Sequence, residues 1–125
     1  MSQQPTRSDA TPVAADALRD WATRCFAAAG MTNEDAALLA SSLVQTSLWG
    51  IDSHGVGLLP WYLDELAAGH MARSGDPAVV SDRGAAFVWD GRLLPGAVLL
   101  TRAMDLACDR AVALGVVTAA IHSAH

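Results

Sequence analysis

Apolar residues recur every three or four positions along the first half of the chain, a spacing that predicts amphipathic helices. One helix is expected over residues 12–29, ending where Gly30 can form a left-handed cap. A second is expected from Thr32, whose hydroxyl is a good N-cap, to Gly50. Because the connection through Gly30 and Met31 is short, we expect these two helices to pack as antiparallel neighbours.

The second half of the chain mixes strands and helices, and its last element is the most informative. Residues 116–121 form a continuous apolar run, which is typical of a β-strand covered on both faces. Such a strand needs neighbours at both edges, and few other strands are expected here. We therefore expect the sequence to be truncated relative to its functional parent. The other expected elements are a helix over 60–69, strands over 78–81 and 85–89, and a helix over 95–114.

These elements predict an α/β (α+β) fold in which N-terminal helices precede strands and a long helix. Residues 1–11 are polar and are expected to form a disordered leader. Residues 12–125 are expected to form the N-terminal portion of one domain. A hydrophobic content of 52% against 17% charged residues supports a packed core for that portion. The long helix is expected to bury an apolar face made of Leu100, Ala103, Met104, Ala107, Ala111 and Leu114.

Charge and composition exclude several classes of function. The net charge of −5 argues against a nucleic-acid partner, which selects a basic surface. No run approaches the ~18 apolar residues that a membrane span requires, and the polar start lacks the features of a secretory signal. We therefore expect a cytoplasmic protein with no membrane partner. In that compartment Cys25 and Cys108 fit buried thiols better than a disulfide.

His54 is the first candidate for chemistry. It lies between Ser53 and Gly55, ahead of a helix and two residues after Asp52. A helix N-terminus disfavours the imidazolium and a carboxylate favours it, so the group can titrate near neutral pH, where proton transfer is efficient. Gly55 would let a substrate approach the backbone closely. A purely structural role for this histidine in a turn is an equal alternative.

His125 is the second candidate, because it follows the carboxyl end of the last expected strand, where active sites of sheet-based enzymes often gather. Ser123 precedes it by two residues, and a frayed terminal residue is the alternative. The pair His122 and His125 could suggest a metal site, but a strand directs residues three apart to opposite faces, so no metal is expected. The sequence has no Gly-rich fingerprint for a dinucleotide.

Two parts of the sequence together resemble the malate/L-lactate dehydrogenase family. This family is unrelated to the Rossmann enzymes and includes ureidoglycolate and sulfolactate dehydrogenases and diketogulonate and cyclic-imine reductases. The first part of the resemblance comprises Gly50-Ile51-Asp52-Ser53-His54-Gly55-Val56, Leu59-Pro60, Tyr62 and Gly69. The second comprises Asp90-Gly91, Pro95-Gly96, the alanine-rich helix to Gly115, and Ser123 with His125. The resemblance spans nearly the whole chain from Leu18, so residues 12–125 look like the N-terminal portion of a domain of this type.

The resemblance implies an oxidoreductase that uses NAD or NADP to interconvert a 2-hydroxy acid and a 2-keto acid, or to reduce a related imine. One imidazole would exchange a proton with the substrate while hydride moves to or from the nicotinamide. The family's pattern also implies cofactor-binding residues beyond residue 125 and a homodimer in the complete protein. The site residues that it implies are His54 and His125 for catalysis, and Asp52, Ser53, Gly55 and Ser123 for substrate binding.

The sequence departs from the family pattern at Leu58 and Ile121, where arginine is common. An apolar side chain cannot make the bidentate contact that an arginine makes with a carboxylate. Two alternatives to the enzyme are a non-catalytic helical interaction or dimerisation module, with Trp49 and Trp61 as contact residues, and an inactive truncated product. The Asp-Ser-His-Gly-Val stretch favours the enzyme.

Overall fold

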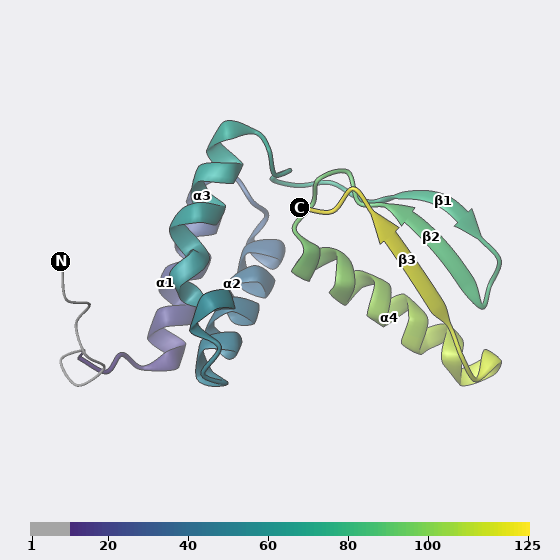
Figure 1. Ribbon diagram of the computed structural model, residues 1–125, viewed down its shortest axis with the longest axis horizontal. Helices are drawn as coiled ribbons and strands as arrows, with labels where there is room; N and C mark the ends of the chain where they lie inside the picture. The colour runs from purple at the N-terminus through teal and green to yellow at the C-terminus, as the bar shows by residue number, and fades with distance from the viewer. Residues whose placement is uncertain (1–10) are drawn as a thin grey trace.

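Three helices packed side by side form the first half of the chain in the computed structural model (Figure 1). The structure describes residues 11–125, so the leader expected over residues 1–11 lies almost entirely outside the described part. Strands and a fourth helix form the second half. The helices of the first half are α1 (Ala15–Ala28), α2 (Asn33–Leu48) and α3 (Leu59–Ala68).

The local signals that predicted these helices act as expected. The Thr32 hydroxyl accepts the Asp35 N–H at 3.2 Å and so caps the first turn of α2. Pro60 occupies the first turn of α3, where its missing N–H costs no hydrogen bond. Gly69 ends α3 with a φ of 77°, in the left-handed region that favours glycine.

The second half is a small sheet with one long helix against it. The strand order is β1-β2-β3, with β1 antiparallel to β2 and β3 parallel to β2. The helix provides the crossover that joins the two parallel strands. These elements are β1 (Ala78–Asp82), β2 (Ala86–Asp90), α4 (Gly96–Leu114) and β3 (Thr118–His122), and together with the helical half they confirm the expected α/β (α+β) class.

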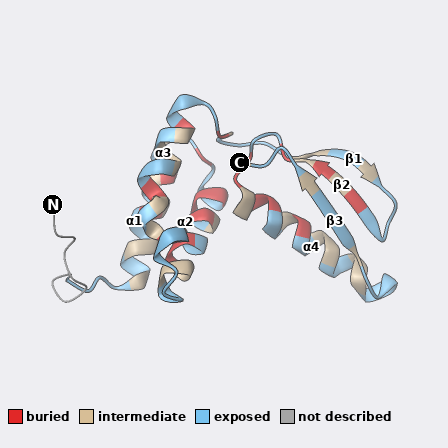
Figure 2. Cartoon of the chain, in the orientation of Figure 1, coloured by how far each residue is buried: buried red, intermediate tan, exposed pale blue. Residues whose placement is uncertain are grey.

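Two hydrophobic clusters hold the described chain together (Figure 2). The larger cluster lies among the helices and includes Phe26, Leu39 and Leu66, each with at most 1% of its surface exposed. The smaller one joins Phe87 and Trp89 of the sheet to Ala103 of α4. Within residues 11–125, no helix combines the length and apolar character needed to cross a membrane.

Some burial predictions for the second half are wrong. β3 is an edge strand and most of it is exposed, although the apolar run predicted a strand covered on both faces. On α4, Leu100 and Met104 are 66% and 61% exposed, and Leu114 is 48% exposed. Cys108 of the same helix is also exposed rather than buried. Among the described residues, no element covers the exposed side of α4 or the exposed residues of β3.

An ion pair with a buried carboxylate connects the helical half to the sheet half. Asp35 at the start of α2 is 3% exposed, and both of its carboxylate oxygens accept hydrogen bonds from Arg102 Nη2 on α4, at 2.8 and 2.9 Å. The same guanidinium donates to the Gly75 carbonyl at 2.8 Å. Arg102 therefore binds α2, the loop before β1 and α4 to one another.

A hydroxyl group connects α2 to the turn that follows it. The Ser47 Oγ accepts the Val56 N–H at 2.9 Å. It fills the position that a Cβ atom at Gly55 would occupy, so a side chain at position 55 would overlap it. Glycine at position 55 is therefore required by the packing of α2 against this turn.

We expect Arg102→Ala to lower the free energy of unfolding by about 3 kcal/mol, because the buried Asp35 carboxylate would lose its partner. Urea denaturation measures this change. Arg19→Ala removes the exposed pair with Asp16 on α1 and is expected to cost under about 1 kcal/mol. Equal effects of the two substitutions would contradict the role assigned to Arg102.

Gly55→Ala is expected to cost about 1–3 kcal/mol, the usual penalty for overpacking, because the new methyl group must displace Ser47 or the turn. Gly57→Ala is the matched control, since the nearest atom to its added Cβ is the Asp52 carbonyl oxygen at 3.9 Å. Thermal melting of the two variants compares them directly. A Gly55→Ala protein as stable as the Gly57→Ala protein would refute the packing argument.

Candidate functional site

His54 lies on an exposed turn between α2 and α3. The turn consists of two short 3-10 segments, Asp52–His54 and Val56–Leu58. The His54 Nδ1 lies 2.9 Å from the Ser53 hydroxyl, so one nitrogen of the ring has a fixed neighbour. Asp52, Ser53 and His54 are all exposed, whereas Gly55 is buried under Ser47. The Nδ1 contact orients the imidazole and leaves Nε2 for a ligand.

His125 is held by its main chain. The segment from His122 to His125 lies across the stretch between β2 and α4 and exchanges hydrogen bonds with it. The His125 N–H donates to the Leu94 carbonyl at 3.1 Å, and its carbonyl accepts the Gly96 N–H at 3.2 Å. The Gly91 N–H donates to the His122 carbonyl at 2.7 Å. The backbone of Gly91, Leu94 and Gly96 thus holds the His125 segment, and we call these three residues the His125 cradle. Gly91 and Gly96 belong to the Asp90-Gly91 and Pro95-Gly96 pairs on which the family resemblance rests.

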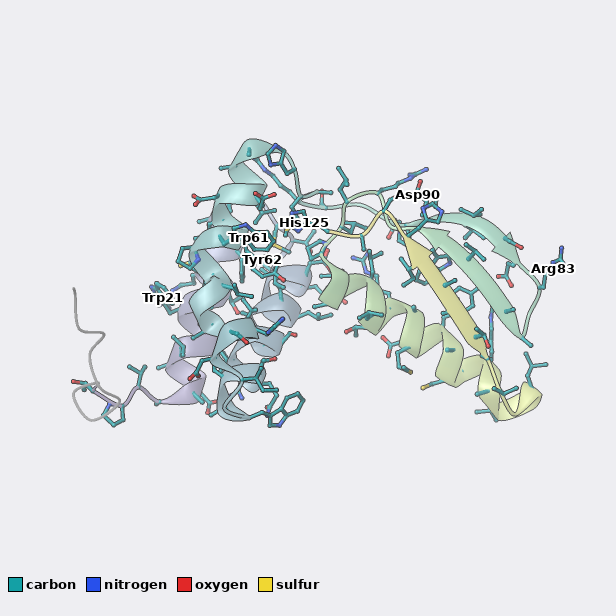
Figure 3. All side chains as sticks on the ribbon, in the orientation of Figure 1. Trp21, Trp61, Tyr62, Arg83, Asp90 and His125 are labelled. Atoms are coloured by element: carbon teal, nitrogen blue, oxygen red, sulfur yellow. The ribbon has the colours of Figure 1, made fainter. Side chains whose placement is uncertain are left out.

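The His125 ring packs against α3 (Figure 3). Its centroid lies 5.1 Å from the Trp61 ring and 6.5 Å from the Tyr62 ring. Its Nε2 lies 2.9 Å from Glu65 Oε2, and the imidazole side chain is 14% exposed. The other nitrogen, Nδ1, is buried and has no hydrogen-bond partner among the described residues. When the ring is neutral, an Nε2–H bonded to Glu65 leaves Nδ1 as a proton acceptor.

Glu65 was not anticipated from the sequence. Its carboxylate contacts two imidazoles, because His70 Nδ1 also lies 3.3 Å from Oε2. The hydrogen bond from His125 lowers the pKa of Glu65 from its ordinary value of 4.5; burial opposes this shift, and the charge of His70 adds to it. The sequence carried one usable signal: Glu65 follows Trp61 by four residues and so shares its face of α3.

The other predicted site residues lie in two separate places. Ser123 has a φ of 53°, and its hydroxyl lies 3.0 Å from His122 Nδ1 rather than near His125. His54 precedes α3, whereas His125 lies along that helix, and no described contact joins the two rings. Their convergence on one substrate stays a prediction. Among residues 11–125, no three His, Cys, Asp or Glu side chains form a group suited to a metal ion.

Solved structures have the same fold as this chain. Malate dehydrogenase from Pyrococcus horikoshii matches with a TM-score of 0.89 and 28% identity, over 92% of this chain and 33% of its own. Sulfolactate dehydrogenase from Methanocaldococcus jannaschii matches with a TM-score of 0.85 and 31% identity, over 89% of this chain and 32% of its own.

Curated relatives and a family model agree with these structures. Hydroxycarboxylate dehydrogenase B of Escherichia coli is 32% identical over 89% of this chain and 31% of its own length. The Δ1-pyrroline-2-carboxylate/Δ1-piperideine-2-carboxylate reductase of Pseudomonas syringae is 35% identical over 99% of this chain and 35% of its own length. The chain thus spans about a third of the length of these relatives. The model of malate/L-lactate dehydrogenase matches residues 13–125, and the chain therefore belongs to the malate/L-lactate dehydrogenase family.

Proposed function

We propose that this chain contributes to a dehydrogenase that interconverts a 2-hydroxy acid and a 2-keto acid, or reduces a related cyclic imine, with NAD or NADP. The family match over residues 13–125 carries the proposal, because it includes both the His54 turn and the His125 cradle. The names of the relatives support this range of substrates, since they comprise a hydroxycarboxylate dehydrogenase and a cyclic-imine reductase. A homodimer in the cytoplasm is part of the same proposal.

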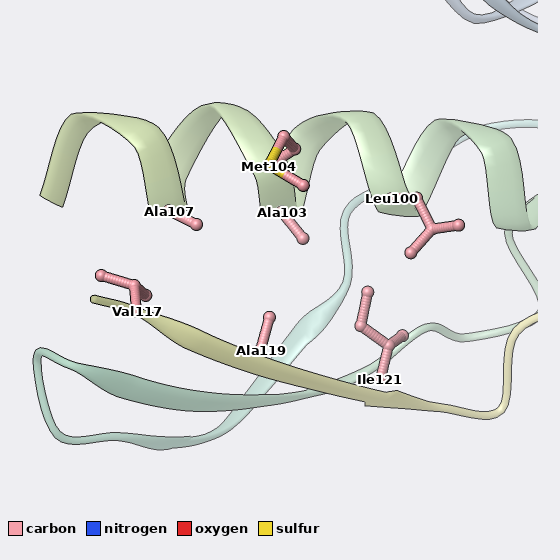
Figure 4. A pocket seen from close by; sticks show the side chains of 7 residues that line it. All are labelled: Leu100, Ala103, Met104, Ala107, Val117, Ala119 and Ile121. Carbon is pink, nitrogen blue, oxygen red and sulfur yellow. The ribbon is translucent and has the colours of Figure 1, made fainter. Parts of the chain in front are cut away.

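The described residues do not by themselves fit a dinucleotide cofactor. A groove of about 370 Å³ lies between α4 and β3 (Figure 4), but the side chains that line it are apolar, including Leu100, Met104 and Val117. A pyrophosphate needs backbone N–H groups or cationic side chains, and this groove offers no cation. We therefore assign cofactor binding to the part of the domain that the relatives have outside the matched third.

Proton handling is the part of the reaction that we assign to this chain. The hydrogen bond to Glu65 fixes which nitrogen of His125 carries the proton in the neutral ring. A substrate oxygen that gains negative charge would then take a proton from His125. Its Nδ1 is the nitrogen without a protein partner, and it must become accessible when a substrate binds.

His54 is the second imidazole of the proposed site. Its ring is exposed and its Nδ1 is oriented by Ser53, so Nε2 can contact a substrate. We assign substrate contacts also to Asp52 and Ser53 of the exposed turn, and to Ser123. Gly55 is buried and its N–H donates to the Asp52 carbonyl, so we assign it a packing role in this turn. Leu58 packs against the helical core and cannot bind a carboxylate, so the substrate's carboxylate must be held by a group other than this side chain.

The lowered pKa of Glu65 predicts how the free energy of unfolding changes at acid pH. Because the pKa is lower in the folded chain than its ordinary 4.5, the ionised carboxylate stabilises the fold above that pH, and the stabilisation is lost as the pH falls through the folded-state pKa. Glu65→Gln should therefore lose less stability than the wild type between about pH 5 and pH 3. Urea denaturation across this range measures the difference. Asp64→Asn, at an exposed position of the same helix, is the control and should follow the wild-type profile.

A chimera tests the proposed activity. This chain would replace the corresponding third of the Escherichia coli hydroxycarboxylate dehydrogenase B, and oxidation of NADH or NADPH would be followed with 2-keto acids and cyclic imines. We expect turnover, and we expect His54→Ala and His125→Ala each to lower kcat by roughly 10²–10⁴-fold, the usual contribution of general acid–base catalysis. The 125-residue chain alone is expected to give no turnover.

The control for the chimera is Val112→Ala, which truncates a side chain that is 92% exposed on α4 and should keep kcat within about twofold of the parent chimera. Circular dichroism verifies that every variant folds. A folded chimera without activity on either substrate class would contradict the proposed function. Near-parental kcat in both His→Ala variants would instead remove the roles assigned to these residues.

A further inference from the structure

Trp61 is a half-exposed tryptophan beside His125 and is not part of the helical core. Its indole lies 5.1 Å from the His125 ring, with 40° between the two planes. It also meets the Tyr62 ring nearly edge-on at 5.1 Å, and Tyr62 in turn meets the buried Phe26 at 6.3 Å. These centroid separations are those of favourable aromatic pairs. A row of rings therefore runs from His125 to the helical core, with Trp61 nearest to the imidazole (Figure 3).

One turn of α3 separates Trp61 from Glu65, so the two side chains are neighbours on the helix surface. Both contact the His125 imidazole, but the two contacts differ in kind. The carboxylate of Glu65 binds the edge of the ring, with Oε2 at 2.9 Å from Nε2. The indole packs against the ring itself. The helix therefore holds the imidazole in two ways, although His125 belongs to the other half of the chain.

A single hydrogen bond does not fix the orientation of an imidazole. The main chain of His125 is held by the His125 cradle, but the last side-chain torsion of a histidine has a broad minimum. The ring can therefore tilt while its Nε2 stays bonded to Glu65, and this tilt moves Nδ1. An indole packed against the ring restricts the tilt, because the movement would either open a gap at the contact or cause overlap.

Trp21 provides a matched comparison for Trp61. It is 48% exposed on α1, against 47% for Trp61 on α3. Trp21 takes part in none of the ring contacts found among residues 11–125. The two tryptophans thus have equal exposure but differ in their contact with His125, so a substitution at Trp21 controls for the loss of a half-exposed indole.

We propose that Trp61 is a positioning residue whose indole fixes the tilt of the His125 imidazole and thereby the place of Nδ1. The importance of that place rests on the proposed function, in which the buried Nδ1 exchanges a proton with the substrate. Displacing a catalytic group by about 1 Å can lower the rate by roughly 10²-fold. Trp61 acts through His125 and needs no contact with the substrate.

Nuclear magnetic resonance of the 125-residue chain tests the orientation without any measurement of activity. The measured quantity is the rate at which the His125 Nε2 proton, bonded to Glu65, exchanges with water. We expect Trp61→Leu to raise this rate roughly three- to tenfold, the effect of losing one aromatic pair. Trp61→Phe keeps a ring and should stay within about twofold of the wild type. The control Trp21→Leu should also stay within about twofold.

Kinetics of the chimera test the consequence for catalysis. Trp61→Leu should lower kcat by roughly 10- to 100-fold and leave KM within about twofold, because the indole does not bind the substrate. Trp61→Phe should recover most of the lost kcat. Trp21→Leu should keep both constants within about twofold of the parent chimera. Thermal melting verifies that each variant is folded at the assay temperature, so that a lower kcat is not a loss of folded protein.

Three results would overturn the proposal. The first is an unchanged exchange rate of the Nε2 proton in Trp61→Leu. The second is a parental kcat for Trp61→Leu in an active chimera. The third is a raised KM with an unchanged kcat, since the indole would then bind the substrate instead. An inactive chimera, by contrast, contradicts only the proposed function, because the exchange rate in the 125-residue chain still decides whether Trp61 holds the ring.

Discussion

The contact between Asp35 and Arg102 determines how the two halves of the described chain meet. A carboxylate buried at the start of α2 requires a cation, and the guanidinium that satisfies it comes from α4. The helical half is thereby fixed against the beginning of α4, close to the segment that holds the chain's last residues. The contact between Glu65 and His125 crosses the same junction. Any site that includes His125 is therefore a property of both halves together.

The sequence was a good guide wherever the determining interactions are local. Thr32, Pro60 and Gly69 act within one turn of their own position, and the helix ends that they mark agree with the structure to within a residue or two. The pairing of Glu65 with His125 joins positions sixty residues apart, and no periodic pattern reports such a contact. His54 and His125 were recognisable as candidates, but their surroundings could be learned only from the fold.

The prediction that α4 and β3 are buried was wrong, and the reason is physical. An apolar pattern predicts that a surface is buried, but it does not identify the segment that buries it. The pattern at Leu100 and Met104 is that of a core position, whereas the described residues leave both side chains exposed. Apolar residues at helical spacing that remain uncovered are therefore a surface suited to a further contact.

The hydroxyl of Ser47 in the space beside Gly55 has a consequence for sequence divergence within the family. The side chain of Ser47 occupies the space where a Cβ atom at position 55 would lie. A larger residue at either position therefore requires a smaller residue or a backbone shift at the other. A lineage that loses the serine hydroxyl would also leave the Val56 N–H without this acceptor. Positions 47 and 55 are therefore expected to vary as a pair, even though only one of them belongs to the recognisable motif.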